Sequence, residues 1–248
     1  MTRALLVLAV GAGLVLGVVA WGVFWPRARL FGRARSRLDA NDASSNRVAL
    51  TFDDGPCPGS TDRILDTLAQ HGVRATFFVI GRHCELHPEL VRRIADEGHT
   101  IGNHTYDHHR WGLLRMWAYW SDQIDRTQRA VERVTGEAPR VFRAPMGFRA
   151  PPLVRAARRR GLTLWAWSRR AYDAGLGSRR TVLHAARSMR PGDVLLLHDG
   201  REPAGTRRLG LTADTLPEVL AILREAGLHP VPLPTASDAH SGAGEASG

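Results

Sequence analysis

The sequence predicts an α/β fold in which parallel strands alternate with helices as a small, distorted (β/α)7 barrel. From Asn46 onward, short apolar runs alternate with longer amphipathic ones, which is the pattern of repeated strand–helix units. Seven candidate strands within 46–234 favour a small, irregular barrel over an open sheet. The periodicity by itself does not separate these two arrangements.

The predicted strands are short apolar runs, and the predicted helices are amphipathic runs bounded by proline and glycine. The strands are expected at 48–52, 75–80, 100–103, 140–143, 163–167, 194–197 and 228–231. The helices are expected at 61–71, 88–97, 116–135, 152–160, 179–189 and 212–226. Pro88 and Pro152 suit a first helical turn, and glycines follow the helix ends, where a left-handed residue is favoured. Those glycines are Gly72, Gly98, Gly136, Gly161 and Gly227.

The chain contains no lysine, so all 34 basic residues are arginine, and the formal net charge is +10. The absence of lysine excludes Schiff-base chemistry. Residues 1–45 contribute +4 and residues 235–248 contribute −2, which leaves +8 for the middle. A basic middle suits an anionic polymer or a lipid surface, although a GC-rich genome explains excess arginine equally well. Because no nucleic-acid motif is present, we expect no nucleic-acid partner.

The chain has two cysteines, Cys57 and Cys84. Their spacing is not that of a zinc ribbon, and one pair is too few for a disulfide scaffold. They could form one disulfide outside the cytosol, but two unrelated thiols are the default expectation.

Residues 4–25 form an uncharged run of 22 residues, which predicts a transmembrane anchor within 1–25. A cleaved signal peptide is the alternative, because Val18-Val19-Ala20 resembles a cleavage site, but the apolar run continues beyond it. We expect a basic linker at 26–45, one folded domain at 46–234 and a disordered tail at 235–248.

Two adjacent carboxylates, Asp53 and Asp54, follow the first predicted strand in the sequence Thr-Phe-Asp-Asp-Gly-Pro. Neighbouring side chains on a strand point to opposite sides, so we expect the two acids to differ in purpose. One could bind a metal while the other moves a proton. Taken alone, this motif is more simply a solvated turn.

His104 and His108 follow the third predicted strand and are four residues apart. On a helical turn this spacing places both imidazoles on one face, where they could chelate a divalent metal. A surface helical turn is the simpler interpretation of an isolated pair. His109 is a further candidate that the spacing does not exclude.

Further polar residues follow the later predicted strands. Arg143 comes after the fourth, Asp173 lies beyond the fifth, and His198 follows the sixth. The carboxyl ends of barrel strands converge on one face, so we expect these residues to meet the two acids and the histidines in one cup.

The ordered motifs TFDDGP, HTYDH, RAPMG, the Trp-Ser stretch leading to Asp173, and LLLHD resemble those of the NodB-type polysaccharide deacetylases, carbohydrate esterase family 4. The resemblance covers roughly residues 46–234. The first two motifs are highly specific, and the fourth is looser. The resemblance implies that Asp54, His104 and His108 bind a divalent ion, zinc or alternatively cobalt, that activates water.

The resemblance also implies roles for the other positions. Asp53 would be the general base, kept ionised and oriented by Arg143. His198 would be the general acid that protonates the departing amine, and Asp173 would fix its tautomer. The backbone N–H of Met146 would stabilise the oxyanion.

The chain departs from the family pattern at two of these positions. Met146 stands where the family usually has an aromatic residue, and Ala174 follows Asp173 where many members have tryptophan. The second departure bears on the role of Asp173. Arg169 and Arg170 lie close by, as solvated surface or as contacts to an anionic substrate.

The expected function is metal-dependent removal of N-acetyl groups from an acetamido-sugar glycan such as peptidoglycan or a chitin-like polymer. One alternative is a deformylase or deacetylase of a lipid-linked sugar, which would suit the anchor. Another is a catalytically inactive sugar-binding protein. The sequence does not indicate an oligomeric state.

Two observations disagree about the side of the membrane on which the domain lies. Five arginines between positions 27 and 37 follow the apolar run, which by the positive-inside rule predicts a cytoplasmic domain. Glycan chemistry predicts an extracytoplasmic one. We weigh the chemistry more heavily and expect a single-pass protein of the cell membrane with its catalytic domain outside.

Overall fold

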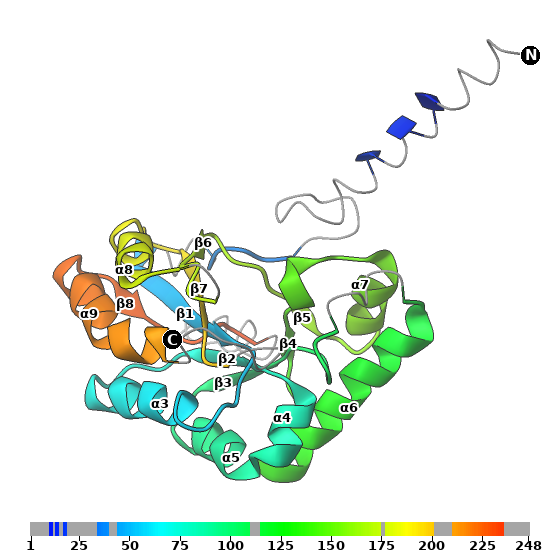
Figure 1. Ribbon diagram of the computed structural model, residues 1–248, viewed down its shortest axis with the longest axis horizontal. Helices are drawn as coiled ribbons and strands as arrows, with labels where there is room; N and C mark the ends of the chain where they lie inside the picture. Colours follow the sequence, from blue (N-terminus) through cyan, green and yellow to red (C-terminus); the bar gives the residue numbers. More distant parts are fainter. Residues whose placement is uncertain are drawn as a thin grey trace, which may run out of the picture.

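The computed structural model describes residues 34–39, 44–109, 115–174, 177–200 and 210–235, together with positions 10, 11, 13, 14, 17 and 18. A curled sheet of parallel strands forms its centre, and helices wrap around the outside of the sheet (Figure 1). The predicted α/β class and parallel sheet are confirmed.

The strands of the sheet follow the order β5-β4-β3-β2-β1-β7-β6, and β8 pairs with the start of β1. Seven of them correspond to the seven predicted strands. The remaining one, β6, consists of two arginines and carries no apolar pattern that would predict it. Their bounds are β1 (Arg47–Asp53), β2 (Thr76–Val79), β3 (Thr100–Asn103), β4 (Val141–Phe142), β5 (Thr163–Leu164), β6 (Arg169–Arg170), β7 (Val194–His198) and β8 (His229–Pro230).

All six predicted helices are present, with ends within two residues of those expected. A short helix, α4, and a single 3-10 turn, η2, were not predicted, because each is too short for its periodicity to be visible in the sequence. The bounds are α3 (Thr61–Gln70), α4 (Gly81–Leu86), α5 (Pro88–Asp96), α6 (Trp117–Thr135), η2 (Pro145–Gly147), α7 (Pro151–Arg158), α8 (Arg179–Arg187) and α9 (Leu211–Glu225).

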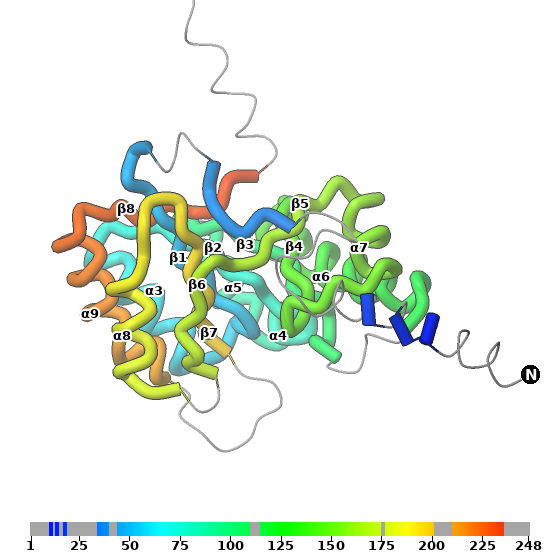
Figure 2. The backbone as a smooth tube through the Cα atoms, turned by 90° about the horizontal axis from the view of Figure 1, so that it is seen from above, coloured from blue at the N-terminus to red at the C-terminus, as the bar shows by residue number. Residues whose placement is uncertain are grey.

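The sheet is a curled half-barrel whose two edges are β5 and β6, and we call the opening between these edges the seam. The segment 34–39 lies across this seam. Arg35 forms a parallel bridge to Trp165 just after β5, and Arg37 forms an antiparallel bridge to Asp193 just before β7. This segment is the medium-blue tube that runs towards β5 in Figure 2, and not the darker pieces near the N-terminus. Part of the predicted basic linker is therefore built into the domain.

Side chains of β1 alternate between two environments. Leu50 and Phe52 point outward into a large apolar cluster with α3, α8 and α9. Ala49 points into the curl of the sheet, where it packs with Phe78. By the same alternation Asp53 points inward. The outer cluster therefore anchors the strand, while the inner face presents polar groups at its end.

The predicted membrane-spanning run at 4–25 lies, apart from six positions, outside the described residues. Among the helices that are described, none is both long and apolar enough to cross a bilayer. The predicted disordered tail lies outside the described residues beyond Thr235. Cys57 and Cys84 are both free thiols, as expected for two unrelated cysteines, and Cys84 is buried.

We predict that Asp193→Ala destabilises the protein by about 2–3 kcal/mol, because it leaves partly buried donors without an acceptor. Asp193 is fully buried and accepts hydrogen bonds from the Ser168 hydroxyl at 2.7 Å, Arg169 Nε at 2.9 Å and the Arg190 amide at 2.9 Å. It also binds Arg37 across the seam. Urea unfolding measures the change.

The matched control is Glu218→Ala, which removes the exposed ion pair with Arg179. We expect this variant to lose less than about 0.5 kcal/mol. Equal losses in the two variants would contradict the assignment of Asp193 as a buried link across the seam.

Candidate active site

Polar side chains gather at the carboxyl ends of neighbouring strands. Asp53 ends β1 and lies beside His198, which ends β7, in the strand register. His104 follows β3, and Arg143 follows β4. Because parallel strands end at the same edge of the sheet, these four side chains share one cup.

Arg143 is entirely buried inside the curl of the sheet and binds Asp53. Its Nη1 donates to Asp53 Oδ1 at 2.7 Å and to Thr51 Oγ1 at 2.8 Å, and its Nη2 donates to the Ala166 carbonyl at 2.9 Å. Burial lowers the pKa of Arg143, and the Asp53 carboxylate partly offsets this. Arginine still keeps its charge near neutral pH. The Asp53 carboxylate therefore faces a fixed positive charge that holds it in place.

Asp54 lies beyond the end of β1 and has a left-handed backbone, with φ of +76°. This turn matters because it changes the direction expected from strand alternation. The carboxylates of Asp53 and Asp54 both approach His104, at 3.7 and 3.5 Å from its Nε2. The expectation that the two acids point to opposite sides is therefore wrong. A left-handed non-glycine residue costs about 1–2 kcal/mol, which the surrounding packing must offset.

Buried histidines set the charge of Asp54. Burial by itself raises the pKa of this carboxyl, but the nearby imidazoles of His104, His108 and His198 outweigh it. The pKa of Asp54 consequently lies well below its ordinary value. Asp54 is thus an anion in the cup at any pH near neutrality.

His104 and His108 approach Asp54 from a loop and not from a helix. Nε2 of His108 lies 3.4 Å from Asp54 Oδ1, and the two imidazole centroids are 4.9 Å apart. The expected helical turn is wrong, because Thr105 and His108 have positive φ values of +67° and +48° and no helix covers 104–109. The extra candidate, His109, packs against Tyr119 instead.

The tautomer of His104 follows from its hydrogen bond to the backbone. Nδ1 lies 2.8 Å from the Arg143 carbonyl, which can only accept, so Nδ1 carries the hydrogen. Burial lowers the pKa of His104, but the carboxylates of Asp53 and Asp54 outweigh it and raise the pKa overall. In the neutral ring the Nε2 lone pair faces Asp54. This is the arrangement of a metal ligand with a supporting partner.

Asp54, His104 and His108 fit a divalent metal ion. Each offers one donor atom, and these atoms lie within 4.8 Å of one another. Asp54 Oδ1 is buried and has no hydrogen-bond partner within the described residues. Its separations from the two Nε2 atoms are too long for well-formed hydrogen bonds, but ligands of a tetrahedral zinc ion at about 2.0–2.1 Å lie about 3.4 Å apart. Three ligands of this kind leave a coordination position open.

His198 is paired with Asp173 on the opposite side of the cup. Nδ1 of His198 lies 2.9 Å from Asp173 Oδ1, and its backbone N–H donates to Oδ2 at 2.6 Å. Burial lowers the pKa of His198, but Asp173 outweighs it, with help from Asp54 and Asp53, and raises the pKa to about 9. The structure therefore brings Asp173 to His198 although Ala174 departs from the family pattern. His198 is held in its protonated form at neutral pH.

The environment of Asp173 favours its ionised form. Burial raises the pKa of this carboxyl, but His198 and the hydroxyl of Thr212, which donates at 2.5 Å, outweigh it and lower the pKa overall. Asp173 thus supplies the negative charge that keeps a proton on His198.

Met146 lies in η2, directly after β4, with a left-handed φ of +56° and a side chain that is half exposed. Gly147 beside it is left-handed as well, and a Cβ there would lie 2.7 Å from the Trp167 ring. The turn therefore lies against the wall of the cup, with the Met146 side chain facing solvent at its rim.

The sequence interpretation missed Asp199, which supports the turn that carries Asp54. Asp199 is buried and accepts from the Gly55 amide at 3.0 Å and the Thr61 hydroxyl at 2.7 Å. Burial, with the charge of Asp54, raises the pKa of Asp199 to about 7 despite the Thr61 hydrogen bond. The signal that could have revealed it was the acidic residue directly after His198, just past the end of a predicted strand.

Known proteins resemble this chain in sequence. A peptidoglycan-N-acetylglucosamine deacetylase of Bacillus cereus is 36% identical over 189 residues, which are 76% of this chain and 67% of that protein. A chitooligosaccharide deacetylase of Bradyrhizobium is 37% identical over 207 residues, with 79% of this chain and 94% of that protein covered.

A solved structure is similar as well. The family 4 carbohydrate esterase from Streptomyces lividans, in complex with acetate, superposes with a TM-score of 0.66 at 34% identity and covers 74% of this chain and 91% of that one. The sequence model of polysaccharide deacetylases matches residues 40–165. The chain belongs to the polysaccharide deacetylase family.

Proposed function

We propose that this protein is a metal-dependent N-deacetylase that hydrolyses the acetamido group of a glycan such as peptidoglycan or a chitin-like polymer. The observation that carries the proposal is the meeting of three groups in one cup. They are the Asp54–His104–His108 ligand set, the Asp53–Arg143 ion pair and the Asp173–His198 pair. The curled sheet that holds them supports the expected distorted (β/α)7 barrel.

The residues divide the work of hydrolysis between them. A divalent ion bound by Asp54, His104 and His108 would acidify a water molecule and polarise the acetamide carbonyl. Zinc is the metal we propose, because one carboxylate and two imidazoles with an open position are typical of catalytic zinc sites. Cobalt is the alternative.

Proton transfer falls to the side chains on either side of these ligands. Asp53 accepts the proton of the attacking water, and Arg143 holds its carboxylate in place. His198 donates a proton to the nitrogen of the departing sugar amine, and Asp173 keeps His198 charged and oriented. The Met146 N–H donates to the acetamide carbonyl oxygen, on which negative charge develops during hydrolysis.

The membrane anchor at 4–25 and the extracytoplasmic location stay predictions. An active alkaline phosphatase fused to the C-terminus would support an outside domain, and an inactive one in a stable fusion would contradict it.

We predict that the purified protein releases acetate from peptidoglycan or from chitooligosaccharide, and that Asp53→Asn lowers kcat by about 10²–10⁴-fold because the base is lost. Acetate release measured with a coupled assay checks this, and a melting curve checks that the variant is folded. Formate release from a lipid-linked sugar would instead favour a deformylase of lipid-linked sugars. A protein that binds its metal but releases neither acid would favour the sugar-binding alternative.

We predict about one divalent ion per chain, which His104→Ala removes because two ligands remain. Elemental analysis of the purified protein measures the metal content. The control is His109→Ala, since His109 lies in the same loop but against Tyr119. An undiminished metal content in the His104 variant would show that the site has been assigned wrongly.

We predict that Asp173→Asn moves the alkaline limb of the kcat–pH profile to lower pH by about one unit or more. His198 acts as an acid only when protonated, so activity falls as pH rises through its pKa. Asp173 raises the pKa of His198 to about 9, so removing its charge lowers that pKa and the fall begins earlier. Asp214→Asn, at an exposed ion pair with Arg63, is the control and leaves the limb in place.

A further inference from the structure

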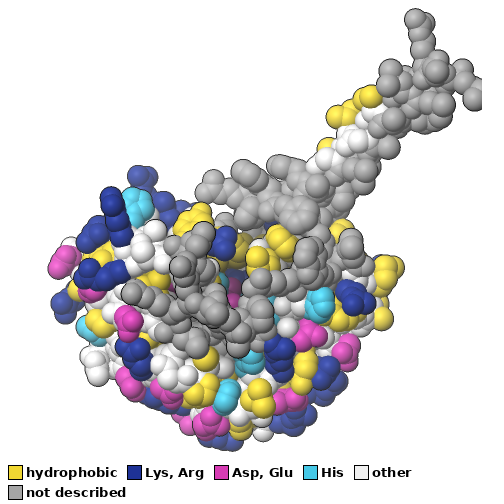
Figure 3. Space-filling view, in the orientation of Figure 1, with side chains coloured by type: hydrophobic (Ala, Val, Ile, Leu, Met, Phe, Trp, Pro, Cys, Tyr) yellow, Lys and Arg dark blue, Asp and Glu magenta, His cyan; other side chains and the backbone are white. Residues whose placement is uncertain are grey.

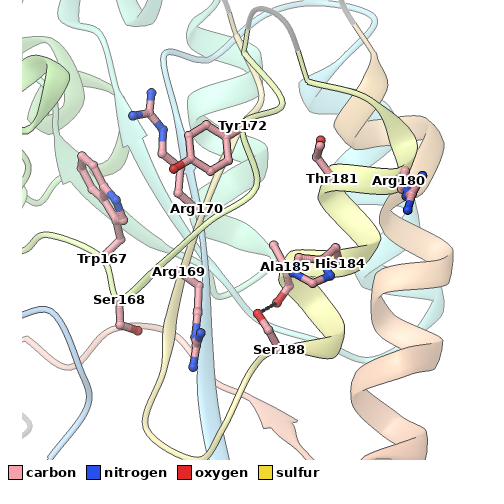
Figure 4. Close-up of a pocket in the computed structure, with 10 residues that line it drawn as sticks. All are labelled: Trp167, Ser168, Arg169, Arg170, Tyr172, Arg180, Thr181, His184, Ala185 and Ser188. Carbon is pink, nitrogen blue, oxygen red and sulfur yellow. Dashed lines mark hydrogen bonds between the residues drawn. The ribbon is translucent and has the colours of Figure 1, made fainter.

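A groove of about 770 Å³ lies between the edge strand β6 and helix α8 (Figure 4). Its volume is in the range of small-ligand sites. We call it the arginine groove. Its lining residues are Trp167, Ser168, Arg169, Arg170, Tyr172, Arg180, Thr181, His184, Ala185 and Ser188.

The charge of the arginine groove is entirely positive among its described lining residues, which include three arginines and no carboxylate. Arg169 is committed to Asp193 at 2.9 Å. Arg170 and Arg180 are exposed, one on the strand and the other on the helix. Figure 3 shows basic side chains gathered over α8 on this face of the molecule. The groove therefore favours an anionic ligand.

Arg170 is held in place by aromatic neighbours. Its guanidinium carbon lies 5.9 Å from the centroid of Trp167 and 5.1 Å from that of Tyr172. Alternation along β6 directs Arg169 to the other side, and Figure 4 shows the two side chains pointing apart. A stacked arginine loses less freedom on binding a carboxylate than a mobile one would.

The arginine groove shares a wall with the candidate active site. Trp167 lines the groove, and its ring also lies against Gly147 and 5.8 Å from the guanidinium of Arg143. Tyr172, on the groove side, directly precedes Asp173, the partner of His198. A substrate with its acetamide at His198 can therefore place a neighbouring group in the groove.

We infer that the arginine groove binds a carboxylate carried by the glycan next to the sugar that loses its acetyl group. This inference rests on the proposed deacetylase function and narrows its substrate class. Peptidoglycan carries carboxylates on its peptide stems, whereas a chitin-like polymer is neutral. The enzyme accordingly prefers a carboxylate-bearing acetamido-sugar polymer, and Arg170 and Arg180 determine the preference through charge-assisted hydrogen bonds.

The test compares a soluble peptidoglycan fragment that has free peptide carboxylates with the same fragment after the carboxylates are converted to amides. The wild-type protein should have a kcat/KM about ten-fold higher for the acidic fragment, mainly through KM. In the double variant R170Q/R180Q this ratio should fall to about one. Added salt should also lower the wild-type ratio towards one, because the groove is open to solvent and salt screens its charge.

The matched control is R187Q, which removes an exposed arginine from α8 outside the groove lining. It should keep the wild-type ratio. An equal fall in R187Q, or an unchanged ratio in R170Q/R180Q, would overturn the inference, since net charge or another site would then be responsible.

Equilibrium binding of the two fragments, followed by tryptophan fluorescence, separates this inference from the proposed function. Selective binding of the acidic fragment that R170Q/R180Q abolishes supports the groove even if no acetate is released. Acetate release from both fragments without any selectivity in binding or turnover leaves the deacetylase function standing and overturns the groove.

Discussion

The buried ion pair between Arg143 and Asp53 is the interaction on which the rest of the structure depends. It lies inside the curl of the sheet, and the guanidinium also binds Thr51 and the Ala166 carbonyl, so one side chain joins β1, β4 and the segment after β5. A buried pair of this kind compensates its desolvation only with good geometry and further hydrogen bonds. The Phe78 ring at 4.1 Å from the guanidinium completes the enclosure. The pair thus stabilises the curl and prepares a carboxylate at its rim.

The turn after β1 converts that rim into a site with two distinct acids. Asp54 takes a left-handed backbone, and its carboxylate turns towards the histidines while Asp53 stays with Arg143. Asp199 holds the turn through the Gly55 amide, and a Cβ at Gly55 would lie only 2.0 Å from the Asp199 carboxylate. The close approach explains why glycine follows the acids. The Arg143 guanidinium beside Asp53 and the imidazole nitrogens beside Asp54 give the two acids different chemistry.

The open seam between β5 and β6 has consequences for both stability and recognition. The segment 34–39 bridges it on one side through Asp193, which also holds Arg169. With Arg169 occupied there, Arg170 is left to face solvent beside Trp167. A closed barrel would pair β6 on both edges. Because β6 is an edge strand, the arginine groove lies open beside the cup.

Much of this protein was determined by its sequence alone, because apolar periodicity, helix-end glycines and polar residues after strands are local signals. They located seven strands, six helices and the residues of the cup. Tertiary structure alone decided the direction of Asp54, the loop that brings His104 and His108 together, the support from Asp199, and the bridged seam. Each of these depends on left-handed backbone or on contacts between distant segments, and neither leaves a periodic pattern in the chain.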